Sequence, residues 1–309
     1  MKLVSFRGKN GAHGVGAVVE GRVVDLSAEV AATEVCARTR EQIARAGLAL
    51  PAAGMLRLLL SGGAGLERIA AGLEQRSRNG GLSSCPALES ISLLAPVPRP
   101  GKIVAVGRNY ADHAKETGVK PFEKPRIIGK LSSSVVAPGE GVRRPATVTK
   151  LDFEAELAVV IGEFGARVAR ADAFGMVAGY TILNDVSARE FQFDVAPPQT
   201  TFAKSMDGFS PMGPWLVTKD EIPNPHQLDV ASWLNGNLMQ KGNTSDLLFP
   251  IDVLIEYISQ FMTLEPGDII ATGTPAGSGA FRTPPVYLQP GDRLRFEISH
   301  IGVMEHAIL

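Results

Sequence analysis

Glu154 and Glu156 lie within a run that, apart from Asp152, is otherwise apolar, Leu-Asp-Phe-Glu-Ala-Glu-Leu-Ala-Val-Val-Ile-Gly over residues 151–162. This composition predicts a buried β-strand, in which alternate side chains project to the same side. Glu154 and Glu156 therefore project together, and the apolar residues beside them pack on the opposite side. Two carboxylates next to a core repel each other and lose hydration, so a raised pKa or a bound cation is needed to relieve them.

A third acidic residue favours the cation. Asp185 ends a second apolar run, over residues 179–184. Carboxylates alone form an all-oxygen ligand set, which suits Mg²⁺, Mn²⁺ or Ca²⁺ better than zinc. The sequence therefore predicts a divalent-metal site, most simply a magnesium site, formed by Glu154, Glu156 and Asp185.

The composition excludes several classes of partner. The chain has 309 residues, of which 45% are hydrophobic and 20% charged, and 31 basic against 32 acidic residues give a net charge of −1. Because no long block of one charge is present, we expect neither a nucleic-acid nor a membrane partner, and a small molecule remains. The start of the chain brings charge and glycine before an apolar leader could form, which predicts a cytoplasmic protein. Cys36 and Cys85 lack partner spacing and fit reduced thiols.

A proline-rich stretch over residues 94–101 predicts a boundary between two domains. We expect a small N-terminal α+β module over residues 1–95 and a catalytic domain over residues 96–309. Within the module, glycine-punctuated alternation predicts an antiparallel meander to about residue 27. Helical spacing of apolar residues follows over 34–46 and 55–76, the second interrupted by glycines at 62–65.

The larger part of the chain is predicted to be rich in β-structure, which makes the fold class α+β rather than a regular alternation of strands and helices. Strands are expected over residues 103–107, 156–161, 177–183, 228–235, 268–272 and 293–298. The plausible helices cover residues 171–176 and 251–262.

His113 and Glu116 are three residues apart in a polar segment that directly follows an apolar strand. On a helix they would share a face, and the carboxylate would orient the imidazole as a general base. The alternative is a surface turn with an incidental polar pair, which the spacing alone favours. The polar, proline-bearing residues 118–125 are typical of a mobile cover.

Further candidates are weaker by themselves. Lys204, between apolar and small residues, is a candidate to stabilise an enolate. Thr274 lies in a Gly/Pro turn after an apolar strand, where a hydroxyl or backbone N–H groups could meet a ligand. Arg189 and Glu190 are expected to form a structural ion pair.

These segments occur in a recognisable order. They are Gly-Arg-Asn-Tyr-Ala-Asp-His-x-x-Glu from residue 107, Asp-Phe-Glu-x-Glu-Leu from 152, Gly-Tyr-x-x-x-Asn-Asp-x-Ser-Ala-Arg from 179, Ala-Lys-Ser from 203, Gly-Pro-Trp-Leu-Val from 213 and Leu-Glu-Pro-Gly-Asp-Ile-Ile-x-Thr-Gly-Thr-Pro from 264. From about residue 100 onward, the chain resembles the fumarylacetoacetate hydrolase family. The likeness implies a mixed β-sandwich roll with a small N-terminal module, a homodimer, and a divalent ion on the same three carboxylates.

The resemblance also implies roles for individual side chains. His113 and Glu116 would form the catalytic dyad of a closing lid, and Lys204 would act beside them. Arg108, Gln192 and Thr274 would bind the substrate. The loop that begins at Phe281 departs from the common pattern, which leaves the substrate less defined.

The leading hypothesis is a metal-dependent hydrolase that cleaves a C–C bond in a β-diketo acid of the acylpyruvate or fumarylpyruvate type, through an enolate that the metal stabilises. The alternative on the same site is a 2-hydroxyhepta-2,4-diene-1,7-dioate isomerase, a 2-oxo acid decarboxylase or a keto-enol tautomerase. A third hypothesis, a non-catalytic Ca²⁺-binding protein, leaves the His113, Glu116 and Lys204 set without a purpose.

Overall fold

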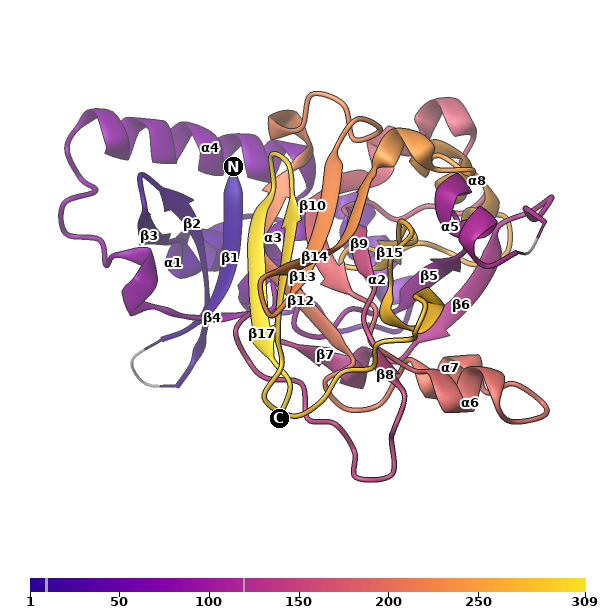
Figure 1. The fold of residues 1–309 in the computed structure, drawn as a ribbon. Helices are drawn as coiled ribbons and strands as arrows, with labels where there is room; N and C mark the ends of the chain where they lie inside the picture. Colours follow the sequence, from indigo (N-terminus) through magenta and orange to yellow (C-terminus); the bar gives the residue numbers. More distant parts are fainter. Residues whose placement is uncertain (9–10, 119) are drawn as a thin grey trace.

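The computed structural model describes residues 1–8, 11–118 and 120–309. These residues form a mixed sheet of eleven strands, an antiparallel sheet of four strands and a pair of two short strands, with helices around them (Figure 1). The α+β, sheet-rich fold predicted from the sequence is confirmed.

The large sheet has the strand order β3-β2-β1-β12-β10-β9-β15-β5-β6, and β4 and β7 pair with β1 and β12. Its strands are β1 (Lys2–Arg7), β2 (His13–Val19), β3 (Arg22–Asp25), β4 (Ser92–Leu94), β5 (Ile103–Gly107), β6 (Arg126–Lys130), β7 (Val135–Val136), β9 (Ala155–Ile161), β10 (Val177–Asn184), β12 (Ser210–Thr218) and β15 (Ile269–Ala271). The four-stranded sheet consists of β13 (Asp229–Leu234), β14 (Asn237–Asn243), β16 (Arg293–Ile298) and β17 (Gly302–Ala307), and the short pair of β8 (Leu151–Asp152) and β11 (Ser187–Ala188).

The α-helices are α1 (Ser27–Ala32), α2 (Ala37–Arg45), α3 (Gly54–Leu59), α4 (Gly62–Arg78), α5 (Ala111–Glu116), α6 (Arg189–Phe193), α7 (Thr200–Ala203) and α8 (Ile251–Ser259). Single 3₁₀ turns are η1 (Leu88–Ser90), η2 (Ser132–Ser134), η4 (Lys219–Glu221), η5 (Thr244–Asp246) and η6 (Gly279–Phe281), and η3 (Arg170–Met176) is longer. Among the described residues, no helix combines the length and apolar character needed to cross a bilayer.

Some predicted helices differ in detail. The segment expected as a helix at 171–176 is the 3₁₀ helix η3, and α8 ends at Ser259 rather than at residue 262. The predicted break in the long N-terminal helix falls at residues 60–61, because Gly62 has a φ of +66° that L-residues rarely adopt. The other glycines of that cluster then form the first turn of α4 rather than a loop.

The N-terminal meander extends the large sheet. Strand β1 pairs antiparallel with β12, with Lys2 opposite Val217 and Leu3 opposite Leu216. In Figure 1 the indigo strands β1–β3 lie on one side of the molecule, with α4 alongside them. The predicted domain boundary near residue 95 stays a prediction, and hydrogen bonding of the sheet continues across it.

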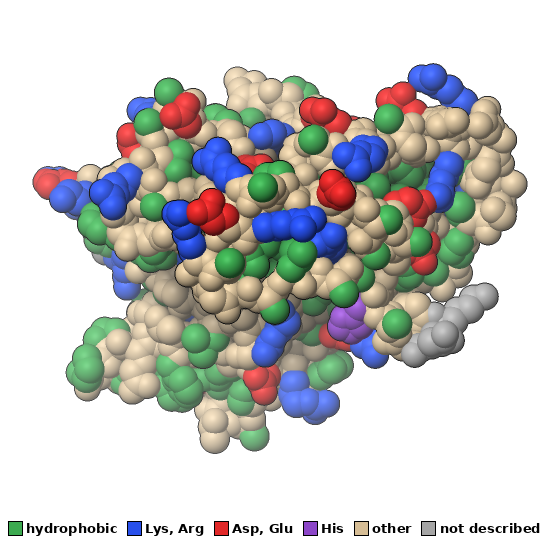
Figure 2. Space-filling model, turned by 180° about the vertical axis from the view of Figure 1, so that it is seen from behind, with side chains coloured by type: hydrophobic (Ala, Val, Ile, Leu, Met, Phe, Trp, Pro, Cys, Tyr) green, Lys and Arg blue, Asp and Glu red, His purple; other side chains and the backbone are tan. Residues whose placement is uncertain are grey.

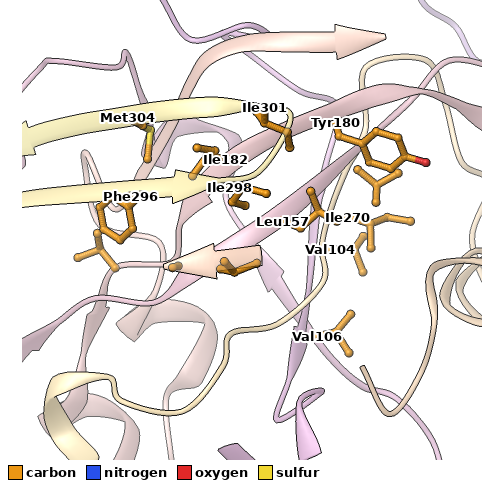
Figure 3. Close-up of a cluster of buried hydrophobic side chains, with 14 of the residues drawn as sticks. Val104, Val106, Leu157, Tyr180, Ile182, Ile270, Phe296, Ile298, Ile301 and Met304 are labelled. Carbon is orange, nitrogen blue, oxygen red and sulfur yellow. The ribbon is translucent and has the colours of Figure 1, made fainter. Parts of the chain in front are cut away.

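The core lies on both faces of β9, whose seven residues are all buried. Leu157 packs in a cluster with Tyr180 and Ile182 of β10 and with Phe296 and Ile298 of the second sheet (Figure 3). Ala158 and Val160, the alternate residues of β9, pack on its other face in a second cluster that includes residues of the N-terminal segment. Burying a side chain of this size contributes about 1.5–3 kcal/mol, so the strands that carry the site are anchored from two sides.

The surface agrees with the nearly neutral charge of the chain. On the face drawn in Figure 2, basic and acidic side chains are interspersed, and the residues described there form no extended region of one sign.

Candidate active site

The sheet topology brings five polar segments to one edge. Strand β9 is antiparallel to β10 and β15, so it begins where those two strands end. Strand β5 is parallel to β15 and antiparallel to β6, so β5 ends and β6 begins at the same edge. Glu154 directly precedes β9, and Asp185 and Arg108 directly follow β10 and β5. Arg126 begins β6 and Thr274 comes three residues after β15, so all five residues lie close together.

The three predicted metal ligands converge. The register of β9 and β10 places Asn184 opposite Ala155, and one residue further the Asp185 N–H donates to the Glu154 carbonyl oxygen at 2.9 Å. One carboxylate oxygen from each of Glu154, Glu156 and Asp185 lies within 4.8 Å of the others, and all three side chains are buried.

Lys204 follows α7 and bridges two of these carboxylates. Its Nζ donates to Glu154 Oε2 at 2.8 Å, to Asp185 Oδ2 at 2.6 Å and to Ser187 Oγ at 2.8 Å. An ammonium has three N–H donors, so all of them are used within the protein. Burial alone would lower the pKa of Lys204, but the charges of Asp185 and Glu154 outweigh it and raise the pKa.

Lys130, at the end of β6, is a buried cation that the sequence interpretation missed. Its Nζ donates to Asp185 Oδ1 at 2.6 Å, to the Phe209 carbonyl at 3.0 Å and to the Lys204 carbonyl. Burial lowers the pKa of Lys130, and Asp185 opposes that shift. Lys130 thus fixes Asp185 from the side opposite to the hydrogen bond with Lys204.

The predicted ion pair between Arg189 and Glu190 is wrong. Arg189 is buried, and its guanidinium donates to Asp152 Oδ2 at 2.9 Å and to Glu154 Oε1 at 2.6 Å. Glu190 instead accepts from the Thr149 N–H at 2.6 Å. Neighbours in sequence diverge here because α6 begins at Arg189 and turns the two side chains to different sides.

The pKa values of Glu154 and Glu156 are shifted in opposite directions. Burial would raise the pKa of Glu154, but Arg189 and Lys204 outweigh it and lower the pKa. The pKa of Glu156 is instead raised well above its ordinary value, by burial and by the charges of Asp185 and Glu154. Among the described residues, only the Gly273 N–H donates to the Glu156 carboxylate, at 2.9 Å. Within the same described part of the chain, Glu156 forms no ion pair, whereas Glu154 and Asp185 do. A carboxylate without a cationic partner, next to two further carboxylates, fits a hard divalent cation.

His113 and Glu116 form the predicted pair on α5. His113 Nδ1 lies 3.0 Å from Glu116 Oε2, and Glu116 Oε1 accepts from the Gly277 N–H at 3.0 Å. His113 is only 3% exposed, so the alternative of a surface turn is wrong. Because Nδ1 is engaged, Nε2 is the nitrogen left for proton transfer. Phe281, from the loop that departs from the family pattern, packs edge-on against the imidazole at 5.1 Å between ring centroids.

The hydroxyl of Thr274 is held in a buried network. It donates to the Ala155 carbonyl at 2.9 Å and accepts from Gln240 Nε2 at 2.7 Å. The neighbouring Gly273 has a φ of +103°, and a Cβ there would lie 2.9 Å from Asn109 Cβ. Glycine is therefore required at position 273 for this turn to pack against the segment that contains Asn109.

Asn184 connects the triad to a buried histidine behind it. Its Oδ1 accepts from the Glu154 N–H at 3.0 Å, and its Nδ2 lies 3.0 Å from His306 Nε2. The His306 ring stacks on Phe296, and burial lowers its pKa to about 4. The sequence interpretation gave this histidine no role, and no local motif marks it.

A single cavity gathers the predicted site residues with the exception of Glu116, which lies behind His113. The cavity is lined by Arg108, His113, Glu154, Glu156, Asp185, Gln192, Lys204 and Thr274, and also by Arg126, Arg189, Phe193 and Phe281. Arg126 was missed because a single arginine at the start of a strand has no signature. Of the predicted cover, Phe122 lies with its ring 5.9 Å from the Arg108 guanidinium carbon, and Val119 lies outside the described residues.

Comparison with known protein families gives a match over most of the chain. Residues 102–309 match the family described as fumarylacetoacetate (FAA) hydrolase C-terminal. Among curated proteins, the mitochondrial oxaloacetate tautomerase FAHD2B of Bos taurus is 45% identical over 219 residues, which cover 71% of this chain and 70% of the relative.

Solved structures match the whole chain. Maleylpyruvate hydrolase from Sphingobium sp. SYK-6, in complex with manganese(II) and pyruvate, is 32% identical with a TM-score of 0.77, covering 100% of this chain and 99% of the other. A probable 2-hydroxyhepta-2,4-diene-1,7-dioate isomerase from Mycobacterium abscessus is 30% identical with a TM-score of 0.72, covering 100% and 98%. These relatives are a tautomerase, a hydrolase and an isomerase, so they support the general reaction class without singling out the predicted hydrolase.

Proposed function

The chain belongs to the fumarylacetoacetate hydrolase family, and we propose that it is a divalent-metal-dependent enzyme that interconverts the keto and enol forms of a small 2-oxo acid, with oxaloacetate as the expected substrate. The observation that carries the proposal is that one cavity contains both the carboxylate triad and the imidazole of His113. The oxaloacetate tautomerases among the relatives direct the choice of substrate.

Glu154, Glu156 and Asp185 would hold the ion, which would be Mg²⁺ or Mn²⁺. When bound, such an ion supplies a Lewis acid that favours negative charge on the oxygen of a 2-oxo acid. The buried cations Lys130 and Lys204 keep two of the ligands ionised and oriented, because they donate to carboxylate oxygens of Asp185 and Glu154.

The proton transfer is assigned to His113. Glu116 accepts a hydrogen bond from the Nδ1–H of His113 and so fixes the tautomer, which leaves Nε2 free to remove a proton from the carbon next to the keto group. The C–H electron pair becomes the C=C bond, and the keto oxygen takes the negative charge. The imidazolium then gives its proton to that oxygen, which completes the enol. Phe281 packs edge-on against the imidazole and thereby helps to hold its orientation during these steps.

Hydrolysis of a β-diketo acid, the leading hypothesis from the sequence, is the second candidate. The observation that favours it is the match to maleylpyruvate hydrolase along the whole chain, including the N-terminal segment. The same Nε2 would then remove a proton from water rather than from carbon.

The test is the rate of keto-enol exchange of oxaloacetate, followed by ultraviolet absorbance with Mn²⁺, with Mn²⁺ alone as the background and with EDTA. We expect catalysis above the background that EDTA abolishes, that is lost in His113→Ala and that is retained in His13→Ala, which removes an exposed histidine. Full exchange by His113→Ala would contradict the assignment. Pyruvate and a free acid from an acylpyruvate, with no exchange of oxaloacetate, would favour the hydrolase.

A further inference from the structure

Two arginines line the cavity beside the carboxylate triad. Arg108 follows β5 and Arg126 begins β6, and the antiparallel register places Gly107 opposite Arg126. The two arginines are therefore neighbours across the strand pair. A Cβ built on Gly107 would lie 3.4 Å from Arg126 Cδ, which shows how closely the Arg126 side chain follows the neighbouring strand.

Within residues 1–8, 11–118 and 120–309, no carboxylate forms an ion pair with either of these two arginines. In the part of the chain that the structure describes, neither guanidinium makes a hydrogen bond or an ion pair, whereas Arg189 in the same cavity binds both Asp152 and Glu154. Burial lowers the pKa of Arg108, and the positive charges of Arg126 and Arg189 lower it further. An anion between Arg108 and Arg126 would remove this repulsion.

The backbone holds Arg108 in an unusual conformation. Its φ is +56°, in the left-handed region that side chains other than glycine rarely occupy. The side chain is kept in the cavity by the Phe122 ring, 5.9 Å from the guanidinium carbon. A strained residue with an unpaired charge inside a cavity is typical of a ligand contact.

We propose that Arg126, together with Arg108, binds a second carboxylate of the substrate and makes the enzyme selective for dicarboxylic 2-oxo acids. The inference rests on the proposed function, because it places the 2-oxo acid end at the triad. A guanidinium binds a carboxylate through two parallel hydrogen bonds, which a methyl ketone of the same size cannot replace. Oxaloacetate has the second carboxylate, and acetylpyruvate has an acetyl group at that position.

The kinetic test compares oxaloacetate with acetylpyruvate in Arg126→Met, which keeps the length of the side chain and removes its charge. We expect kcat/KM for oxaloacetate to fall about 10- to 100-fold, mainly through KM, as for a lost hydrogen bond to a charged group. The value for acetylpyruvate should not fall, and Arg126→Lys should recover part of the loss. Arg143→Met, at an exposed arginine, is the matched control. Equal losses for both substrates, or no loss for oxaloacetate, would overturn the proposal.

A binding test separates this inference from the proposed reaction. Malate and 2-hydroxybutanoate have similar lengths, do not enolise, and differ in the second carboxylate. Calorimetry on the Mn²⁺-loaded protein should show that malate binds about 10- to 100-fold more weakly to Arg126→Met than to the wild type, with 2-hydroxybutanoate unchanged. If malate binding shows this difference but the wild type does not catalyse keto-enol exchange of oxaloacetate, the proposed reaction is rejected and the carboxylate site is retained. Equal malate affinities, or no malate binding by the wild type, would reject the site.

Discussion

His306 should make the stability of the protein depend on pH in a defined window. Burial lowers the pKa of this histidine from 6.5 to about 4, so the ring stays neutral in the folded protein while the unfolded chain takes up a proton. The unfolded state therefore binds more protons between these two values, and the stability that the neutral ring allows is lost as the pH falls from about 6.5 to about 4.

The size of this effect on the free energy of unfolding follows from the lowered pKa of His306. Each pH unit within the window changes the free energy of unfolding by about 1.4 kcal/mol, so lowering the pH from 7 to 5 should cost about 2 kcal/mol through this residue alone. His306→Gln should remove that part of the pH dependence. Glutamine does not titrate, and its amide oxygen can still accept a hydrogen bond from Asn184. The variant loses the stacking on Phe296 at every pH. This loss lowers the free energy of unfolding by the same amount throughout and does not change its dependence on pH.

The assay is urea denaturation at pH 7 and pH 5, with EDTA and at one protein concentration. Between pH 7 and pH 5, the free energy of unfolding of the wild type should fall by about 2 kcal/mol more than that of His306→Gln. His13→Gln, which removes an exposed histidine, should behave like the wild type. Equal losses in the wild type and His306→Gln would refute the reasoning, because the acid sensitivity would then arise from other groups.

Three further substitutions test separate parts of the site. Glu156→Gln removes the ligand that has no cationic partner, and Mn²⁺ binding measured by calorimetry should weaken at least about a hundredfold; an unchanged affinity would exclude Glu156 as a ligand. Lys130→Met leaves the buried Asp185 carboxylate without one of its cations, so the free energy of unfolding in urea should fall by about 3–5 kcal/mol, and a loss below about 1 kcal/mol would contradict this. Phe281→Ala removes the ring that positions His113, and turnover should fall roughly tenfold with Mn²⁺ affinity unchanged; parallel losses in both would indicate a general structural effect.

Much of the fold could be predicted from the sequence because its signals are local. Alternation in residues 1–27 and the apolar runs of β9 and β10 identify strands without any knowledge of their partners. The pairing of β1 with β12 could not be predicted, because residues 2 and 217 meet only through the tertiary structure. The homodimer implied by the family resemblance stays a prediction.

The site shows the same division between local and long-range signals. Glu154 and Glu156 could be found because acidic residues in an apolar strand are conspicuous. Lys130, Arg126 and His306 could not be found, because each is a single polar residue in the first or last two positions of a strand. The function of each depends on side chains far away in sequence. For Arg189, the sequence suggested an ion pair with the adjacent Glu190. That prediction was wrong because Arg189 binds the buried Glu154, which is 35 residues away in the sequence.

The balance of charge at the sheet edge explains why these long-range partners matter. The cluster contains four buried carboxylates and three buried cations: Asp152, Glu154, Glu156, Asp185, Lys130, Arg189 and Lys204. The cations bind every carboxylate except Glu156, so the uncompensated charge is confined to one ligand. A divalent ion would change the balance of the cluster from −1 to +1, which then favours the carboxylate of a 2-oxo acid. The arrangement therefore predicts an order of binding, in which the cation precedes the anionic substrate.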